Sequence, residues 1–279
     1  MFVWPAELET VIGDLPHMSR QGIKLKTQSS DDFVLEAVGL SKQFAGFYAV
    51  REVDLKVRRG SIHALIGPNG AGKTTMFNLL TKFLQPTAGR ILCNGEDITN
   101  AAPAAIARRG TVRSFQISAI FPHMSVMENV RMALQRATGT SFHFWKSDSS
   151  LFSLHERAME LLQSVGLADQ SALRAADLPY GRKRALEFAT TIALDPKILL
   201  LDEPMAGLGR EDIARITTLI RSLAQNRTVL MVEHNLSVVS DLSDYITVLA
   251  RGQVLAEGPY ASVSRNPLVI EAYMGTGHA

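Results

Sequence analysis

The pattern of apolar and polar positions changes along the chain, and each pattern predicts a different element. Residues 1–33 mix both kinds without a period, so we expect an N-terminal extension there, with regular patterning from Val34 onward. Polar and apolar residues alternate over Glu52–Val57, which is typical of a half-buried strand. Ile62–Ile66 is a second short apolar strand, and the dipeptide Asn94-Gly95 predicts a tight hairpin between two further strands.

The second half of the chain predicts helices and a parallel sheet. From Leu154 onward, apolar residues recur at helical spacing, at Ala158, Leu161, Leu162 and Val165. This helix belongs to an expected helical insert over about residues 117–190. Three continuous apolar runs of strand length follow, separated by helical segments, which indicates a parallel sheet covered on both faces. The runs are Ile198–Leu201, Thr228–Val232 and Ile246–Leu249.

Composition narrows the class of protein. The 279 residues are 46% hydrophobic and carry 29 basic and 27 acidic side chains, a net charge of +2, which argues against a disordered or collagen-like chain. The small charge gives no reason to expect a nucleic-acid partner. Cys93 is the single cysteine, so no internal disulfide can form. Charged residues interrupt every long apolar stretch, and we expect no membrane-spanning helix.

A phosphate-binding motif follows the strand that ends at Ile66. Such a loop needs a strand before it and a helix after it, and Thr75 opens a helix-compatible stretch. Glycines let the backbone N–H groups surround a polyphosphate, Lys73 would reach the β and γ phosphates, and the Thr74 hydroxyl would ligate Mg²⁺. A chance match is the alternative. The motif is Gly67, Pro68, Asn69, Gly70, Ala71, Gly72, Lys73 and Thr74.

Two acids follow the apolar run 198–201. A strand that ends in an acid places the carboxylate at the carboxyl edge of the sheet, where α/β proteins bind ligands. Asp202 would hold the metal through its hydration shell, and Glu203 would polarise the attacking water. The alternative is that Asp202 caps a helix and Glu203 lies in its first turn.

Further motifs stand in a fixed order around these two. Phe115-Gln116 follows the glycine loop, Leu178–Arg182 precedes Asp202, and Val232-Glu233-His234 follows it. In this order and spacing, the set resembles the nucleotide-binding subunit of ATP-binding cassette (ABC) transporters over roughly residues 34–275. Within that family the segment 113–116, the long insert and the segment 202–208 are most similar to subunits of branched-chain amino acid importers. The resemblance implies an α/β fold with a RecA-like P-loop core, an antiparallel β subdomain and an inserted helical subdomain.

The resemblance also implies roles for single residues. Gln116 is similar to the glutamine that joins metal and water to the membrane partner, and His234 to a histidine that contacts the γ-phosphate. A buried structural role is the alternative for His234. Phe44 is similar to the aromatic residue that stacks on adenine, with Phe47 and Tyr48 as competitors, and a core position is the alternative for all three.

The signature segment departs from the family pattern Leu-Ser-Gly-Gly-Gln. Pro179 has neither a hydroxyl nor an N–H group, whereas Gly181 and the following helix N-terminus still offer anion donors. The basic run 182–184 either adds positive charge there or forms a solvated helix face. Gly209 also stands where the family has an acid or amide. Both departures concern the site that this chain would complete on a partner subunit.

The implied partners are a second ABC ATPase subunit, identical or different, transmembrane permease subunits and, indirectly, an extracytoplasmic solute-binding protein. ATP and Mg²⁺ are the implied cofactors, and the cytoplasmic face of the bacterial inner membrane is the implied location. Apolar residues near Gln116 either form core or dock the permease: Ile117, Ile120, Phe121, Met124, Val126 and Met127. Ser125 and Glu128 fit a capping box that starts a helix.

Rival functions remain open at this point. A urea or amide importer shares the subgroup pattern, and a lipopolysaccharide-type exporter has similar cassettes. A non-transport ABC ATPase usually carries two cassettes or a coiled-coil insertion. A P-loop kinase leaves Gln116, the signature and His234 unexplained.

Overall fold

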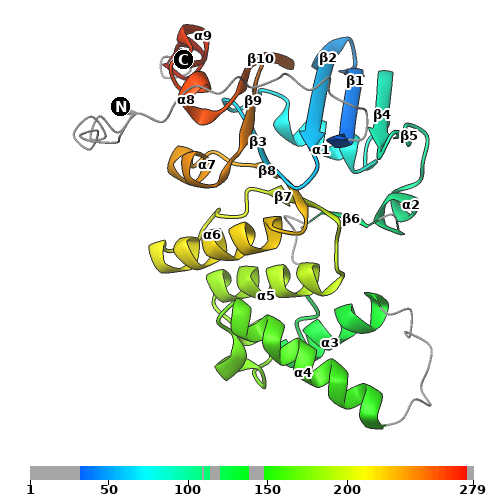
Figure 1. Ribbon diagram of the computed structural model, residues 1–279, viewed down its shortest axis with the longest axis vertical. Helices are drawn as coiled ribbons and strands as arrows, with labels where there is room; N and C mark the ends of the chain where they lie inside the picture. Colours follow the sequence, from blue (N-terminus) through cyan, green and yellow to red (C-terminus); the bar gives the residue numbers. More distant parts are fainter. Residues whose placement is uncertain (1–31, 109, 114–119, 138–147, 275–279) are drawn as a thin grey trace, which may run out of the picture.

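The computed structural model describes residues 32–108, 110–113, 120–137 and 148–274, and these form two sheets with helices around them (Figure 1). One sheet is antiparallel with the order β2-β1-β4-β5, and the other has the order β10-β9-β3-β8-β7-β6. The second sheet is parallel except for its edge pair β9–β10. The strands are β1 Phe33–Phe44, β2 Phe47–Arg58, β3 Ile62–Ile66, β4 Ala88–Cys93, β5 Glu96–Asp97, β6 Thr111–Arg113, β7 Ile198–Asp202, β8 Thr228–Val232, β9 Tyr245–Ala250 and β10 Gln253–Gly258.

The helices lie on both faces of the mixed sheet. α1 packs between the two sheets, and α5, α6 and α7 cover the opposite face. α3 and α4 pack against α5 at the end of the molecule farthest from the antiparallel sheet (Figure 1). The bounds are α1 Lys73–Leu80, α2 Pro103–Arg108, α3 Val126–Ala137, α4 Asp148–Ser164, α5 Tyr180–Ala193, α6 Arg210–Ala224, α7 Leu236–Leu242, α8 Tyr260–Val263 and α9 Pro267–Met274. Two 3₁₀ turns, Ala168–Gln170 and Ala175–Asp177, lie between α4 and α5.

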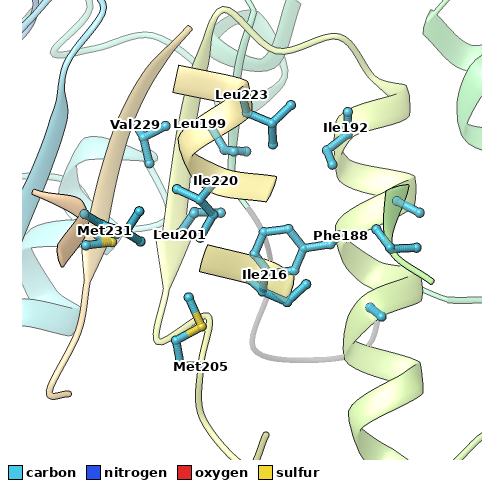
Figure 2. Packing of buried hydrophobic residues seen from close by; sticks show 14 of the residues in the cluster. Phe188, Ile192, Leu199, Leu201, Met205, Ile216, Ile220, Leu223, Val229 and Met231 are labelled. Carbon is cyan, nitrogen blue, oxygen red and sulfur yellow. The ribbon is translucent and has the colours of Figure 1, made fainter. Parts of the chain in front are cut away.

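The parallel strands are buried on both faces because successive residues belong to two separate cores. Leu200 of β7 faces α1 and the antiparallel sheet, whereas its neighbours Leu199 and Leu201 face the helices. Figure 2 shows the second core, in which side chains of β7 and β8 meet side chains of α5 and α6. It includes Phe188, Ile192, Ile216, Ile220, Leu223, Val229 and Met231.

Most elements expected from the residue pattern are confirmed. β3 has the predicted bounds, the alternating positions of β2 bury Val53, Leu55 and Val57, and the three apolar runs form parallel strands. β4 and β5 pair around Asn94 and Gly95, whose φ values of 49° and 78° give the predicted hairpin turn. Regular structure begins one residue earlier than expected, at Phe33.

Two local helical predictions, the helix from Leu154 and the capping box, are confirmed as well. The helix expected from Leu154 coincides with the second half of α4, and its four apolar positions are buried: Ala158, Leu161, Leu162 and, one residue past the end of α4, Val165. The capping box before α3 forms in both directions. The Ser125 N–H donates to Glu128 Oε2 at 2.7 Å, and the Glu128 N–H donates to Ser125 Oγ at 3.1 Å.

His63 in β3 makes the fold sensitive to acid. Its side chain is buried, and its Nε2 lies 2.8 Å from Oγ1 of Thr247. The Thr247 hydroxyl itself donates to Glu257, so the histidine nitrogen must carry the proton and donate. Burial lowers the pKa of His63 to about 4. Since an unfolded histidine titrates near 6.5, acid stabilises the unfolded state relative to the folded one.

We therefore expect His63 to contribute its full stabilisation above pH 6.5 and to lose it as the pH falls toward 4. The loss between pH 7 and pH 5 should be about 2 kcal/mol, measured by urea unfolding at both values. His63→Gln should remove this part of the pH dependence, while His155→Gln, at an exposed position in α4, should leave it unchanged. If the free energy of unfolding changed equally with pH in the wild-type chain and in His63→Gln, His63 would not be the source of the acid sensitivity.

Candidate functional site

The glycine loop spans residues 67–72, between the end of β3 and the start of α1. Gly67, Gly70 and Gly72 have φ values of 150°, 76° and 102°, a region that favours glycine. A Cβ atom at Gly67 would lie 2.1 Å from the carbonyl oxygen of Leu249, and one at Gly72 would lie 2.5 Å from that of Ala49. The loop is therefore held between the ends of β9 and β2, where no larger residue fits.

Lys73 begins α1 and turns back over this loop. Its Nζ donates to the carbonyl oxygen of Gly67 at 2.6 Å and to that of Pro68 at 2.9 Å. Desolvation lowers the pKa of Lys73, and the charges of Glu203 and Asp202 oppose that shift. The ammonium group and the two carboxylates are thus close enough to interact electrostatically.

The remaining loop residues differ in exposure. Asn69, Gly70 and Thr74 are exposed, while Thr75 is half-buried and Ala71 is buried. The exposed side of the loop is therefore the side on which a polyphosphate can lie against backbone N–H groups.

The acid pair lies at the carboxyl edge of the parallel sheet, as expected. Asp202 is the last residue of β7 and is buried, and Glu203 follows it and is half-buried. Glu203 has a φ of 47°, and its N–H donates to the carbonyl oxygen of Val232 at 2.9 Å. The alternative reading of the pair as a helix start is wrong, because the next helix begins only at Arg210, with Gly209 as its N-cap.

Glu233 is a structural acid of the site that sequence reasoning missed. Its side chain is fully buried at the end of β8, and its carboxylate accepts the Met205 N–H at 3.0 Å. The same carboxylate accepts the N–H groups of His234 at 3.0 Å and Asn235 at 3.2 Å. It thus fastens the loop after β7 to the loop after β8. The sequence signal that could have identified Glu233 is its position directly after the apolar strand Thr228–Val232.

His234 is exposed at the carboxyl end of β8. The alternative of a buried structural histidine is therefore wrong. Its position is set by Glu233 on one side and by Asn235 on the other, since the Asn235 side chain accepts the N–H groups of Ser237 and Val238 and caps α7.

Gln116 lies outside the described residues, as does Ile117. Among the neighbouring apolar residues, Val126 and Met127 are buried core, whereas Phe121 is 53% exposed. Ile120 is partly buried against the helical core. The group is therefore divided between core and surface.

The three candidate aromatic residues are all exposed at the turn between β1 and β2. Phe44, Phe47 and Tyr48 are 44%, 71% and 41% exposed, so a core position is wrong for each. The Lys42 ammonium group lies over the Phe44 ring, and the Arg51 guanidinium group lies over the Tyr48 ring. Since Ala49 touches the glycine loop, this turn lies beside the phosphate site.

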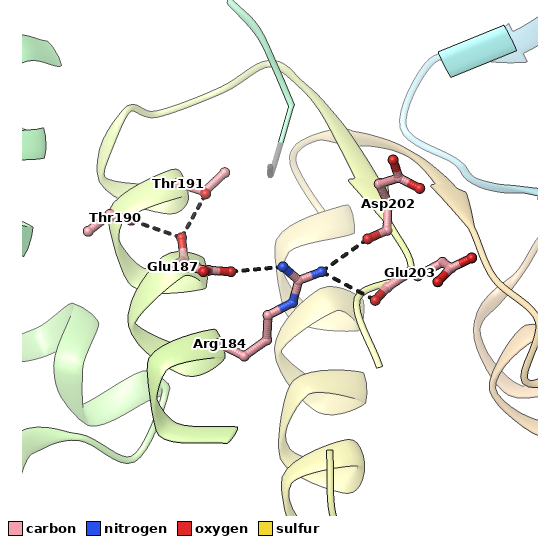
Figure 3. Close-up of polar contacts among 6 residues, drawn as sticks. All are labelled: Arg184, Glu187, Thr190, Thr191, Asp202 and Glu203. Carbon is pink, nitrogen blue, oxygen red and sulfur yellow. Dashed lines mark hydrogen bonds and ion pairs between the residues drawn. The ribbon is translucent and has the colours of Figure 1, made fainter. Parts of the chain in front are cut away.

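The signature segment starts α5, with Pro179 as its N-cap and Tyr180 63% exposed. The basic run after it is not a uniform solvated face. Arg182 and Lys183 are half-buried, whereas Arg184 is 6% exposed and points toward the acid pair (Figure 3).

A glycine loop between a strand and a helix, with an acid pair at a neighbouring strand end, defines a nucleotide-binding protein of the P-loop class. Comparison with known protein families identifies a narrower class than the P-loop geometry does. A family model described as "ABC transporter" matches residues 50–206, and one described as "Branched-chain amino acid ATP-binding cassette transporter" matches residues 253–279. The chain belongs to the ABC transporter family, as an ATPase subunit coupled to transport.

Several relatives are similar over nearly their whole length. The chain is 41% identical to the high-affinity branched-chain amino acid transport ATP-binding protein BraF of Pseudomonas aeruginosa, with 87% of this chain and 98% of BraF covered. It is 39% identical to LivG of Escherichia coli K12 over the same shares. A crystal structure of the ADP conformation of an ABC transporter cassette superposes with a TM-score of 0.74 at 29% identity, covering 87% of this chain and 99% of that one.

Nucleotide binding and the P-loop α/β fold follow from these likenesses. Within the described residues, no helix is both long and apolar enough to span a bilayer.

Proposed function

We propose that this chain binds and hydrolyses ATP to drive an importer of branched-chain or related amino acids. The main support for the substrate class is the 41% identity to BraF over 98% of that protein's length. The C-terminal match to the branched-chain family, over residues 253–279, supports it independently of the nucleotide motifs. We also propose that residues 34–275 form the ATPase domain, with a helical insert over about 117–190 and an N-terminal extension over 1–33.

In the proposed site, the loop Gly67–Thr75 and Lys73 bind the phosphates of ATP, and Glu203 acts as the general base toward water. His234 and Gln116 would contact the γ-phosphate and the metal-bound water, respectively, and Phe44 would stack on adenine. The exposure of His234 and Phe44 at the rim of the phosphate loop is compatible with these roles.

The residues present fit a magnesium ion. Mg²⁺ prefers oxygen ligands and commonly takes only one or two from the protein, with phosphates and water supplying the rest. Thr74 offers a hydroxyl at the start of α1, and Asp202 offers a carboxylate beside Lys73. With Gln116 they would hold the ion, which would neutralise charge on the transferred phosphoryl group.

We propose that two such ATPase subunits, identical or different, act together on transmembrane permease subunits at the cytoplasmic face of the bacterial inner membrane. A solute-binding protein outside would deliver the solute. The signature segment supports the pairing, because Pro179 and Tyr180 at the start of α5 are exposed and available to a second subunit.

Purification of the native complex tests this function. We expect a tagged chain to co-purify with membrane subunits. In proteoliposomes, its ATPase rate should rise several-fold when a binding protein loaded with leucine, isoleucine or valine is added. If a binding protein loaded with urea or a short amide raised the ATPase rate instead, the proposed amino acid substrate would be wrong and a urea or amide importer would take its place. Absence of any membrane subunit would contradict the transporter assignment for this chain.

A further inference from the structure

Arg184 is a buried cation that the phosphate-site motifs do not include. It lies in α5, one turn after the signature glycine Gly181, and its side chain is 8% exposed. Its Nη1 donates to Glu187 Oε2 at 2.8 Å, three residues along the same helix. Its Nη2 donates across to β7, to the carbonyl oxygen of Asp202 at 3.0 Å and to that of Glu203 at 3.3 Å.

The guanidinium group thus contacts the backbone of the acid pair rather than its carboxylates. Figure 3 shows the Asp202 and Glu203 side chains directed away from Arg184 while both carbonyl groups face it. The Asp202 carbonyl group belongs to the peptide group before the Glu203 Cα atom and the Glu203 carbonyl group to the peptide group after it, so a donor shared by both restrains the two peptide planes. The relative orientation of these two planes defines φ and ψ of Glu203, and with them the direction in which its side chain leaves the backbone.

Glu203 needs such support because its backbone conformation is unfavourable for a residue with a side chain. Its φ of 47° lies in the left-handed region, and a strained conformation of this kind persists only where surrounding contacts fix it. The Glu203 N–H is held by Val232, and its carbonyl oxygen accepts the N–H of Ala206 as well as Arg184. Among these contacts, only the one from Arg184 comes from α5.

Glu187 provides the charge partner in this buried setting. Its side chain is 9% exposed, and its own carbonyl oxygen accepts the hydroxyl groups of Thr190 and Thr191 at 2.9 and 2.7 Å. A buried ion pair contributes little net stability compared with apolar residues of similar volume. The pair is therefore poorly explained by stability alone.

We propose that Arg184 is a positioning residue that holds the Glu203 backbone and links it to α5, the helix that begins at the signature segment. The proposal rests on the proposed role of Glu203 as the general base. A shift of α5 relative to β7 would then reorient the base without any contact between Arg184 and the nucleotide.

The test compares Arg184→Met, Arg184→Lys and the double variant Arg184→Met/Glu187→Met in the purified complex, with Arg221→Met as the control. Arg221 is a half-exposed cation of α6 whose guanidinium group pairs with Asp241 at the surface instead of with the acid pair. We expect Arg184→Met to lower kcat by roughly 10- to 100-fold with the KM for ATP changed less than about threefold. Arg184→Lys, which keeps the charge but not the planar fork, should recover part of the rate.

The double variant separates positioning from stability. It leaves no unpaired buried charge, so its thermal unfolding temperature should return toward that of the wild-type complex while its kcat stays low. If Arg184→Met alone does not fold, the kcat of the double variant provides the test instead. Recovery of kcat together with stability in the double variant, or wild-type kcat in Arg184→Met, would overturn the proposal.

Glu203→Gln is measured in the same preparation. If it turns over normally, the base assignment fails, and the proposal fails with it. If it is inactive while Arg184→Met is fully active, only the positioning role of Arg184 is refuted.

Discussion

Glu203→Gln is expected to abolish steady-state ATP hydrolysis in the assembled complex while nucleotide binding persists. Glutamine has nearly the shape of glutamate but cannot accept the proton of the attacking water. Loss of a general base typically lowers the rate by roughly 10²- to 10⁴-fold. The backbone contacts of Glu203 with Val232 and Arg184 involve only main-chain atoms of this residue, so the substitution leaves them in place.

Phosphate release and equilibrium binding of a fluorescent ATP analogue, measured on one preparation, check both halves of this expectation. Glu211→Gln is a matched control, since this acid lies on the surface of α6 with its side chain 84% exposed. The control should hydrolyse ATP at the wild-type rate. Near-normal turnover in Glu203→Gln would refute the assignment of the base.

Lys73→Ala is expected to remove measurable nucleotide binding. The ammonium group is held over the glycine loop by the carbonyl oxygens of Gly67 and Pro68, within the electrostatic range of Asp202 and Glu203. Hydrogen bonds to charged groups contribute about 1.5–3 kcal/mol each, so two lost phosphate contacts would weaken binding by roughly 10²-fold or more.

Isothermal titration with ATP measures this loss. Lys56→Ala is the control, because Lys56 is an exposed lysine of β2 whose ammonium group lies over the Phe33 ring. Its affinity for ATP should match the wild type. Unchanged affinity in Lys73→Ala would contradict the phosphate-binding reading of the glycine loop.

The parts of the site that could be predicted are those whose chemistry lies in adjacent residues. The glycine loop and the Asp202-Glu203 pair each follow an apolar strand, and a strand end fixes where its next residue lies. Local sequence could not decide whether His234 is buried or exposed. That depends on how β8 ends and on the Glu233 contacts that hold the following loop.

Arg184 shows why other parts of the site could not be predicted from the sequence. In sequence it belongs to a basic run, 182–184, that is compatible with a solvated helix face, yet two of its partners lie at the end of β7, 18 and 19 residues away. No local pattern marks a contact between a side chain and main-chain carbonyl groups of another element. The order of strands in the mixed sheet is likewise set by crossovers, which the apolar runs do not specify.

The several anchors of the glycine loop have a kinetic consequence. Gly67 is pressed against Leu249, the Gly252 N–H donates to the Ala71 carbonyl oxygen at 3.0 Å, and Lys73 closes over the loop. A loop already held in this shape needs little ordering when nucleotide arrives. Association should then proceed at a rate close to that of diffusional encounter. Substitutions in the loop should act mainly by shortening the residence time of the nucleotide.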